Sequence, residues 1–254
     1  MEYCSGGSLN TFFWAKRPGR DTKYRFMVEI ASAVAFLHEH DVIHRDLKPD
    51  NVLISYNASV GAGGDGLPHT KVADFGLAKA IASTSLGGDM ADYYMKSGVG
   101  TTYYMAPEVY QKHYTLKADI HAMGLIFMSL IRETSLGASL ATYVPVEDGG
   151  NWPIGKYQTM TKLDIKVNPE AKVGENLCML MRRMLQYDYK GRPTAAEVRD
   201  VLKDEVVASD LDPTPHSRVL TRNPSPEDKQ GLNALRLTAS PFVDKDEDDM
   251  SYSY

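Results

Sequence analysis

Three short polar motifs follow one another in the first half of the chain, and they restrict the possible folds more than any other feature of the sequence. They read HRDLKPDN at residues 44–51, DFG at residues 74–76 and APE at residues 106–108. Aspartate and asparagine oxygens are ligands that Mg²⁺ prefers, and a lysine beside them can neutralise a phosphate. Three such motifs in this order and at these separations are very improbable by chance.

The motifs resemble those of the eukaryotic protein kinase family, and the resemblance extends from residue 1 to about residue 207. It implies a mainly α (α+β) fold: the helical C-terminal lobe of a protein kinase, with short β-hairpins at the catalytic and metal loops. The resemblance also implies that the N-terminal β lobe is absent from this chain. Residues 1–207 would form the kinase domain from the hinge through the C-terminal lobe. Residues 208–254, polar and acidic, are expected to form a disordered tail.

The catalytic and metal loops supply the first expected site residues. In similar kinases the aspartate at position 46 orients the substrate hydroxyl and accepts its proton, and Lys48 neutralises the γ-phosphate. The resemblance assigns Mg²⁺ to Asn51 and Asp74, so the implied cofactors are ATP and Mg²⁺. As isolated residues, these carboxylates and the amide would be ordinary turn or loop-capping side chains.

The residues around these loops indicate the substrate class. Similar kinases that act on serine and threonine carry DLKPxN at positions 46–51, whereas tyrosine-specific kinases typically have arginine and alanine there. In GTTYYMAPE, residues 100–108, Thr101 matches the threonine that packs beside the catalytic aspartate in the Ser/Thr branch. The expected substrates are therefore Ser and Thr hydroxyls of proteins.

The beginning of the chain, MEYCSGGSL, is similar to the hinge between the two kinase lobes. The resemblance places backbone groups of Glu2 and Cys4 near adenine, Ser8 near the ribose at the start of the next helix, and Leu53 among the nucleotide-binding residues. The phosphate-covering glycine loop and the strand lysine of a kinase would precede residue 1. Because a missing lobe would expose an interface of ~600–1,500 Å², we expect an incomplete kinase that is inactive alone and prone to aggregate.

The stretch GAGGDG, residues 61–66, fits the pattern G-x-G-x-x-G of phosphate-binding loops. Such loops hold phosphate through backbone N–H groups at the end of a strand, but the flanking sequences YNASV and LPHT are loop-like. The stretch also follows the catalytic loop instead of preceding it. We therefore predict an expanded hairpin turn whose glycines supply positive φ angles.

Several residues match structural roles in the family. Asp119 is either a helix N-cap or the residue that ties the buried helix at 116–132 to the catalytic loop. Glu108 and Arg192 are expected to form a buried ion pair. His44 is expected to be a core histidine beside Phe75. His121 stands where relatives usually have tryptophan, a change expected to affect packing only.

Arg45, which precedes the catalytic aspartate, is typical of kinases that bind a phosphate of their own activation loop. We therefore hypothesise that Ser97 or a neighbour is phosphorylated and orders the polar segment 77–100. The alternative is an unmodified, solvated loop.

Hydrophobic periodicity predicts the helices. One spans residues 21–40, one spans 116–132, and a third contains Leu177–Leu185. A last helix begins at TAAE, where Thr194 and Glu197 have the spacing of a capping box. Short β-branched stretches at 41–44, 51–54 and 70–75 predict strands, and residues 135–175 show no interpretable pattern.

Charge and cysteine content limit the location and partners. A formal net charge of −5 gives no general attraction to nucleic acid or to an anionic membrane. The longest nearly apolar run, residues 121–131, is too short to span a bilayer. Cys4 and Cys178 are too few for a disulfide framework, so a reducing compartment, the cytoplasm and/or nucleus, is expected.

Residues 103–134 are also similar to a small Ser/Thr kinase group that interacts with a PDZ-and-LIM-domain protein on actin, which implies such a partner. A second function is compatible with the sequence: a non-catalytic, kinase-like scaffold or binding module. The presence of all four catalytic side chains favours the enzyme, and the missing small lobe favours the scaffold. The reading frame upstream of residue 1 would distinguish the two.

Overall fold

Helix α5, Leu116–Arg132, is buried along almost its whole length, as its nearly continuous apolar sequence predicts. The Thr115 side chain caps its first turn by accepting a hydrogen bond from the Lys117 N–H, and Glu133, in the left-handed conformation with φ 54°, ends it. The fold around it comes from a computed structural model that describes residues 3–56, 66–74, 79–80, 101–137, 139–145, 150–167 and 174–211. All of these belong to one unit, residues 1–215.

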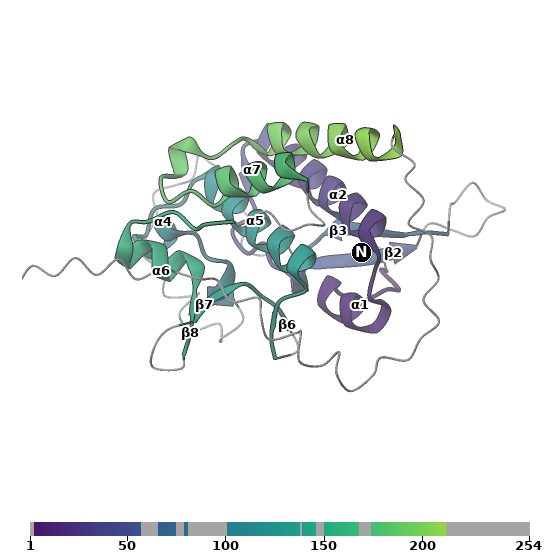
Figure 1. Cartoon of the computed structure of the whole chain (residues 1–254), viewed down its shortest axis with the longest axis horizontal. Helices are drawn as coiled ribbons and strands as arrows, with labels where there is room; N and C mark the ends of the chain where they lie inside the picture. The colour runs from purple at the N-terminus through teal and green to yellow at the C-terminus, as the bar shows by residue number, and fades with distance from the viewer. Residues whose placement is uncertain are drawn as a thin grey trace, which may run out of the picture. The chain divides into compact units, whose positions relative to one another are not determined.

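Long helices pack around α5 and form the main core. Helix α2, Arg20–Glu39, and helix α7, Glu175–Met184, both contact α5, and helix α8, Ala195–Leu211, packs along α2 (Figure 1). These helices confirm the predicted segments at 21–40 and 177–185. The predicted capping box is also present, because Thr194 and Glu197 exchange hydrogen bonds between their side chains and backbone N–H groups.

Short antiparallel strand pairs join the helices, so the described fold is helix-rich with some β structure. The hairpin of β2, Val52–Tyr56, and β3, Pro68–Val72, carries the loops of the site. The other strand pairs are β1 with β4 (Val42–Ile43, Lys79–Ala80), β5 with β6 (Ser135–Leu136, Ser139–Leu140) and β7 with β8 (Tyr143–Pro145, Asn151–Pro153). The remaining helices are α1 (Leu9–Lys16), η1 (Pro49–Asn51), η4 (Thr101–Tyr104), α4 (Pro107–Tyr110), α6 (Ile154–Thr161) and η5 (Tyr189–Gly191).

The glycine-rich stretch lies between the two strands of the β2–β3 hairpin, as predicted. Of its residues only Gly66 is among those described, and it has a positive φ of 66°. Strand β3 follows Gly66 and Leu67, so among the described residues no helix begins directly after the stretch, as a strand–loop–helix phosphate site would require.

The C-terminal helix extends beyond the expected end of the kinase domain. Helix α8 continues to Leu211, beyond residue 207, and residues 212–254 lie outside the described part of the chain. No helix among the described residues has the length and apolarity needed to cross a bilayer.

Candidate active site

The carboxylate of Asp46 lies in the catalytic loop and is held by two side chains that follow it. Lys48 Nζ lies 2.8 Å from Asp46 Oδ2, and Asn51 Nδ2 donates hydrogen bonds to the same oxygen at 3.0 Å and to the Asp46 carbonyl at 2.8 Å. Asp46 and Asn51 are both only 8% exposed. Because the amide nitrogen of Asn51 donates to Asp46, its amide oxygen is the atom that can act as a metal ligand.

Asp74 is brought to the same end of the β2–β3 hairpin as Asn51. Val52 pairs with Val72, and the N–H of Ala73 donates to the Asn51 carbonyl at 2.8 Å. Asp74 is exposed and has a φ of 62°, a left-handed conformation that costs energy in a residue other than glycine. The Asp74 carboxylate and the Asn51 amide oxygen therefore belong to adjacent loops. Carboxylate and amide oxygens are the kind of ligand that Mg²⁺ prefers.

Asp119, near the start of α5, fixes the backbone that precedes Asp46. Its two carboxylate oxygens accept hydrogen bonds from the N–H groups of His44, at 2.8 Å, and Arg45, at 3.1 Å. Arg45 has a φ of 73°, so this anchor holds a strained residue next to the candidate base. The structure confirms the predicted tie to the catalytic loop and excludes the helix-cap alternative, because Thr115 caps α5.

His38 was not identified from the sequence, although its Nε2 lies 3.0 Å from Asp119 Oδ2. His38 follows Ile30 and Val34 at intervals of four residues, so it lies on the buried face of α2. A polar residue at this position of the apolar pattern could have indicated a buried polar contact. His44 is fully buried, as predicted, and its ring contacts the Ala73 carbonyl at 3.0 Å. Phe75, its expected neighbour, lies outside the described residues.

The first residues of the chain are joined to β2. The N–H of Gly6 donates to the Ile54 carbonyl at 2.9 Å, the N–H of Ile54 donates to the Gly7 carbonyl at 2.8 Å, and Ser8 forms an antiparallel bridge with Leu53. A Cβ atom at position 6 would lie 2.6 Å from the Ile54 side chain, so this approach requires glycine.

The predicted nucleotide contacts partly coincide with this junction. Ser8 and Leu53 are brought together, and Ser8 also caps α1 by accepting from the Thr11 N–H at 3.3 Å. The carbonyl of Cys4 accepts from the Gly7 N–H at 3.4 Å in the preceding turn. Glu2 and the side chain of Thr101 lie outside the described part of the structure, so their expected roles remain predictions.

Comparison with known proteins agrees with this geometry. Residues 1–202 match the protein kinase domain family. The chain belongs to the protein kinase family. It is 32% identical over 197 residues to calcium-dependent protein kinase 6 of Plasmodium berghei (strain Anka), a match that covers 77% of this chain and 12% of that relative. The kinase domain therefore spans a small part of the length of that protein.

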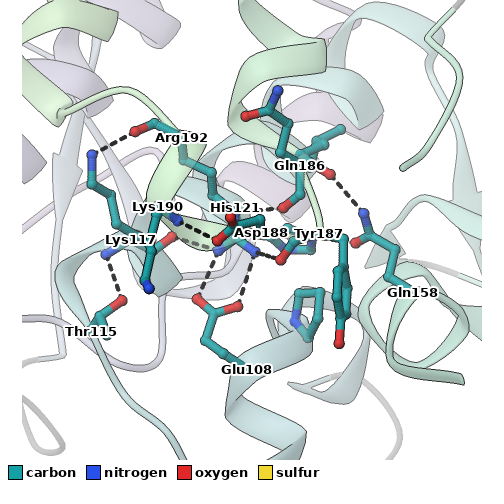
Figure 2. Close-up of polar contacts among 12 residues, drawn as sticks. Glu108, Thr115, Lys117, His121, Gln158, Gln186, Tyr187, Asp188, Lys190 and Arg192 are labelled. Atoms are coloured by element: carbon teal, nitrogen blue, oxygen red, sulfur yellow. Dashed lines mark hydrogen bonds and ion pairs between the residues drawn. The ribbon is translucent and has the colours of Figure 1, made fainter. Parts of the chain in front are cut away.

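The kinase domain contains the predicted buried ion pair, drawn in Figure 2. Arg192 Nη1 and Nη2 donate to the two carboxylate oxygens of Glu108 at 2.7 and 2.9 Å. The guanidinium of Arg192, a residue only 2% exposed, also donates to the carbonyls of Lys117 at 2.9 Å and Gln186 at 2.8 Å. A bidentate pair with its remaining donors satisfied joins the APE motif firmly to the C-terminal helices.

His121 of the kinase domain makes a buried polar bridge, a structural contact away from the candidate active site. Its Nε2 lies 2.9 Å from Gln158 Oε1, and Gln158 Nε2 donates to the Leu185 carbonyl at 2.7 Å (Figure 2). His121 Nδ1 has no hydrogen-bond partner among the described residues. Burial, reinforced by the charge of Arg192, lowers the pKa of His121 well below its ordinary value, so the imidazole stays neutral.

Arg45 of the kinase domain stacks on Tyr114, with its guanidinium carbon 5.5 Å from the ring centroid. The two side chains border a cavity of about 20 Å³ that is also lined by Asp46, Tyr104 and Asp119. Burial raises the pKa of Tyr114 to about 12 against the opposing effect of Arg45. Segment 81–100, with the candidate phosphorylation site Ser97, lies outside the described residues.

Proposed function

We propose that the chain transfers the γ-phosphoryl group of ATP to Ser or Thr hydroxyls of proteins, and that its described residues form the helical, C-terminal lobe of the kinase. The observation that carries the proposal is the carboxylate of Asp46, which is held by Lys48 and Asn51 beside the loop of Asp74. Phosphoryl transfer requires mainly such positioning and charge stabilisation.

Each side chain has a defined task in this reaction. Asp46 accepts a hydrogen bond from the substrate hydroxyl, turns its oxygen toward the phosphorus and takes up the proton. Lys48, 2.8 Å from Asp46, balances the negative charge that gathers at the transferred group. The oxygens of Asn51 and Asp74 would hold Mg²⁺, which supplies charge neutralisation at the phosphates when bound.

The test compares the protein expressed from its complete reading frame with its Asp46→Asn and Asp74→Asn variants, using Ser, Thr and Tyr peptides, ATP and Mg²⁺. Asp46→Asn is expected to lower turnover by about 10²–10⁴-fold because it removes the proton acceptor. Asp74→Asn is expected to weaken Mg²⁺-dependent nucleotide binding. If the unsubstituted protein from the complete reading frame binds nucleotide but transfers no phosphoryl group, it is a non-catalytic, kinase-like binding module instead.

The proposal extends to regulation through Arg45, whose guanidinium lies against Tyr114 next to Asp46. A phosphate in residues 77–102 would bind this guanidinium by charge-assisted hydrogen bonds. Phosphopeptide mapping of active protein is expected to find a modified Ser97 or neighbour, and an unmodified segment in active protein contradicts the idea.

The sequence of residues 103–134 supports closer kinship with the kinases that interact with a PDZ-and-LIM-domain protein, and with it a location in the cytoplasm and/or nucleus. A binding measurement with such a purified protein, with the kinase domain of another family member as control, would test this kinship.

A further inference from the structure

Asn10 is a buried amide that lies between two segments of the site. It belongs to the first turn of α1 and is only 6% exposed. Its Nδ2 donates to Asp50 Oδ1 at 2.8 Å, and its Oδ1 accepts from the Leu140 N–H at 2.8 Å. Both ends of the amide are therefore used, one toward the catalytic loop and one toward β6.

The connection continues beyond Leu140. The carbonyl of Leu140 accepts a hydrogen bond from the hydroxyl of Tyr104, which is 6% exposed and belongs to η4. Three hydrogen bonds thus link Asp50, Asn10, Leu140 and Tyr104 in series. Burial, and next the charge of Asp50, raise the pKa of Tyr104 well above its ordinary value, which agrees with the closeness of the two ends.

The ends of this series lie next to groups of the proposed reaction. Asp50 is the neighbour of Asn51 in η1, and Tyr104 is in the turn that begins at Thr101, the residue expected beside the catalytic aspartate. The amide of Asn10 is suited to the link because a single side chain presents a donor and an acceptor in a fixed geometry. An apolar side chain of similar size would leave the Leu140 N–H unpaired in the interior.

We propose that Asn10 is a positioning residue that holds η1, with Asn51, in register with η4 through Leu140 and Tyr104. The proposal rests on the proposed kinase function for its catalytic consequence, whereas the physical link does not depend on turnover. Each of its bonds joins groups from different segments of the chain.

The link can be tested by exchanging the amide of Asn10 and the carboxylate of Asp50. In Asn10→Asp, the new carboxylate still accepts from the Leu140 N–H but faces the carboxylate of Asp50. In Asp50→Asn, an acceptor for Asn10 Nδ2 remains. In the double variant, the new amide at position 50 donates to the new carboxylate at position 10, so complementarity is restored with the roles reversed.

Hydrogen exchange of backbone amides in the full chain is the first measurement. Asn10→Asp is expected to accelerate exchange about tenfold or more at the amides of Leu140, Asn51 and Met105, and the double variant is expected to return to the rates of Asp50→Asn. Asn176→Asp is the matched control, because Asn176 Nδ2 donates to Glu205 Oε1 at 2.6 Å on the exposed surface of α7 and α8. It is expected to leave all three amides unchanged.

Steady-state kinetics of the same variants with a Ser/Thr peptide and ATP is the second measurement. Asn10→Asp is expected to lower kcat about tenfold, a loss of about 1.4 kcal/mol of transition-state stabilisation, with rescue in the double variant. A double variant as impaired as Asn10→Asp, or fast exchange confined to Leu140, overturns the proposal. If the unsubstituted protein expressed from its complete reading frame has no turnover but the exchange pattern follows expectation, the kinase function fails and the link stands.

Discussion

Asp119 Oδ2 lies 3.0 Å from His38 Nε2 and 2.8 Å from the backbone nitrogen of His44, so one oxygen joins helix α2 to the catalytic loop. The other oxygen accepts from the Arg45 N–H at 3.1 Å. Asp119 is only 2% exposed, and the Arg45 backbone that it holds is in a left-handed conformation. The geometry of the candidate base therefore depends on a residue that is far from it in the sequence.

Asp119→Ala is expected to destabilise the protein and to loosen the catalytic loop. The buried N–H of His44 and the partly buried N–H of Arg45 would lose their acceptor, and a buried group costs about 1–3 kcal/mol when it is left unpaired. Chemical denaturation gives the total loss, and hydrogen exchange at His44 and Arg45 locates it. Asp119→Asn, which keeps an acceptor oxygen, is the control, and an equal loss in both variants would contradict the explanation.

Glu108→Gln is expected to lower the free energy of unfolding by about 3–5 kcal/mol, because it leaves the buried guanidinium of Arg192 without its counter-charge. Denaturant titration measures this loss. Arg199→Ala breaks the exposed contact between Arg199 Nε and Asp200 Oδ1, 2.8 Å apart, and is expected to leave the unfolding midpoint unchanged. An equal decrease in the free energy of unfolding in both variants would show that burial of the ion pair does not explain the effect of Glu108→Gln.

The neutral, buried imidazole of His121 predicts an acid-dependent loss of stability. Imidazole in the unfolded chain binds a proton below about pH 6.5, whereas the depressed pKa of His121 prevents this in the folded state. The unfolded state then binds more protons, so the free energy of unfolding decreases as the pH falls, by up to ~1.4 kcal/mol per pH unit. Above about pH 6.5 both states are neutral, and this group contributes no pH dependence.

His121→Gln tests this pH dependence, because glutamine can still donate to Gln158 but does not titrate. Its unfolding free energy, measured from pH 7.5 to pH 5, is expected to fall less steeply than that of the unsubstituted protein. His40→Gln changes an exposed histidine and is expected to keep the original slope. If His121→Gln also keeps it, another group is responsible for the acid sensitivity.

Gly155→Ala is expected to separate α6 from the APE motif. A Cβ atom at this position would lie 2.0 Å from the Met105 carbonyl oxygen, which is backbone and cannot turn aside. Overpacking of this kind costs about 1–3 kcal/mol, so the melting temperature should decrease. Gly19→Ala, where no atom lies within 4 Å of the added methyl group, is expected to cost less than about 1 kcal/mol.

Features that depend on local pattern could be predicted from the sequence. Helices α2, α5 and α7 are found where their periodic apolar positions predict them, and α8 begins at its predicted capping box. Both signals depend only on residues a few positions apart. The clustering of Asp46, Lys48 and Asn51 could also be predicted, because these residues are close in the sequence and belong to one motif.

Contacts between distant segments could not be predicted in the same way. The bond between Asn10 and Leu140 joins residues 130 positions apart, and the short strands β5 to β8 have too few residues to show a period. Asn10 and Gln158 appear as ordinary polar residues of amphipathic helices until the fold shows that they are buried. Their importance comes from burial, which local periodicity specifies only for apolar faces.

The two oxygens of the Asp46 side chain are not equivalent, since Lys48 and Asn51 both donate to Oδ2. Both donors hold the carboxylate from one side, and in the proposed reaction the other oxygen, Oδ1, would accept the hydrogen bond of the substrate hydroxyl. An acceptor whose orientation is already fixed loses little conformational entropy when a substrate binds. In the proposed reaction, the position of the accepting oxygen would thus be set before a substrate binds.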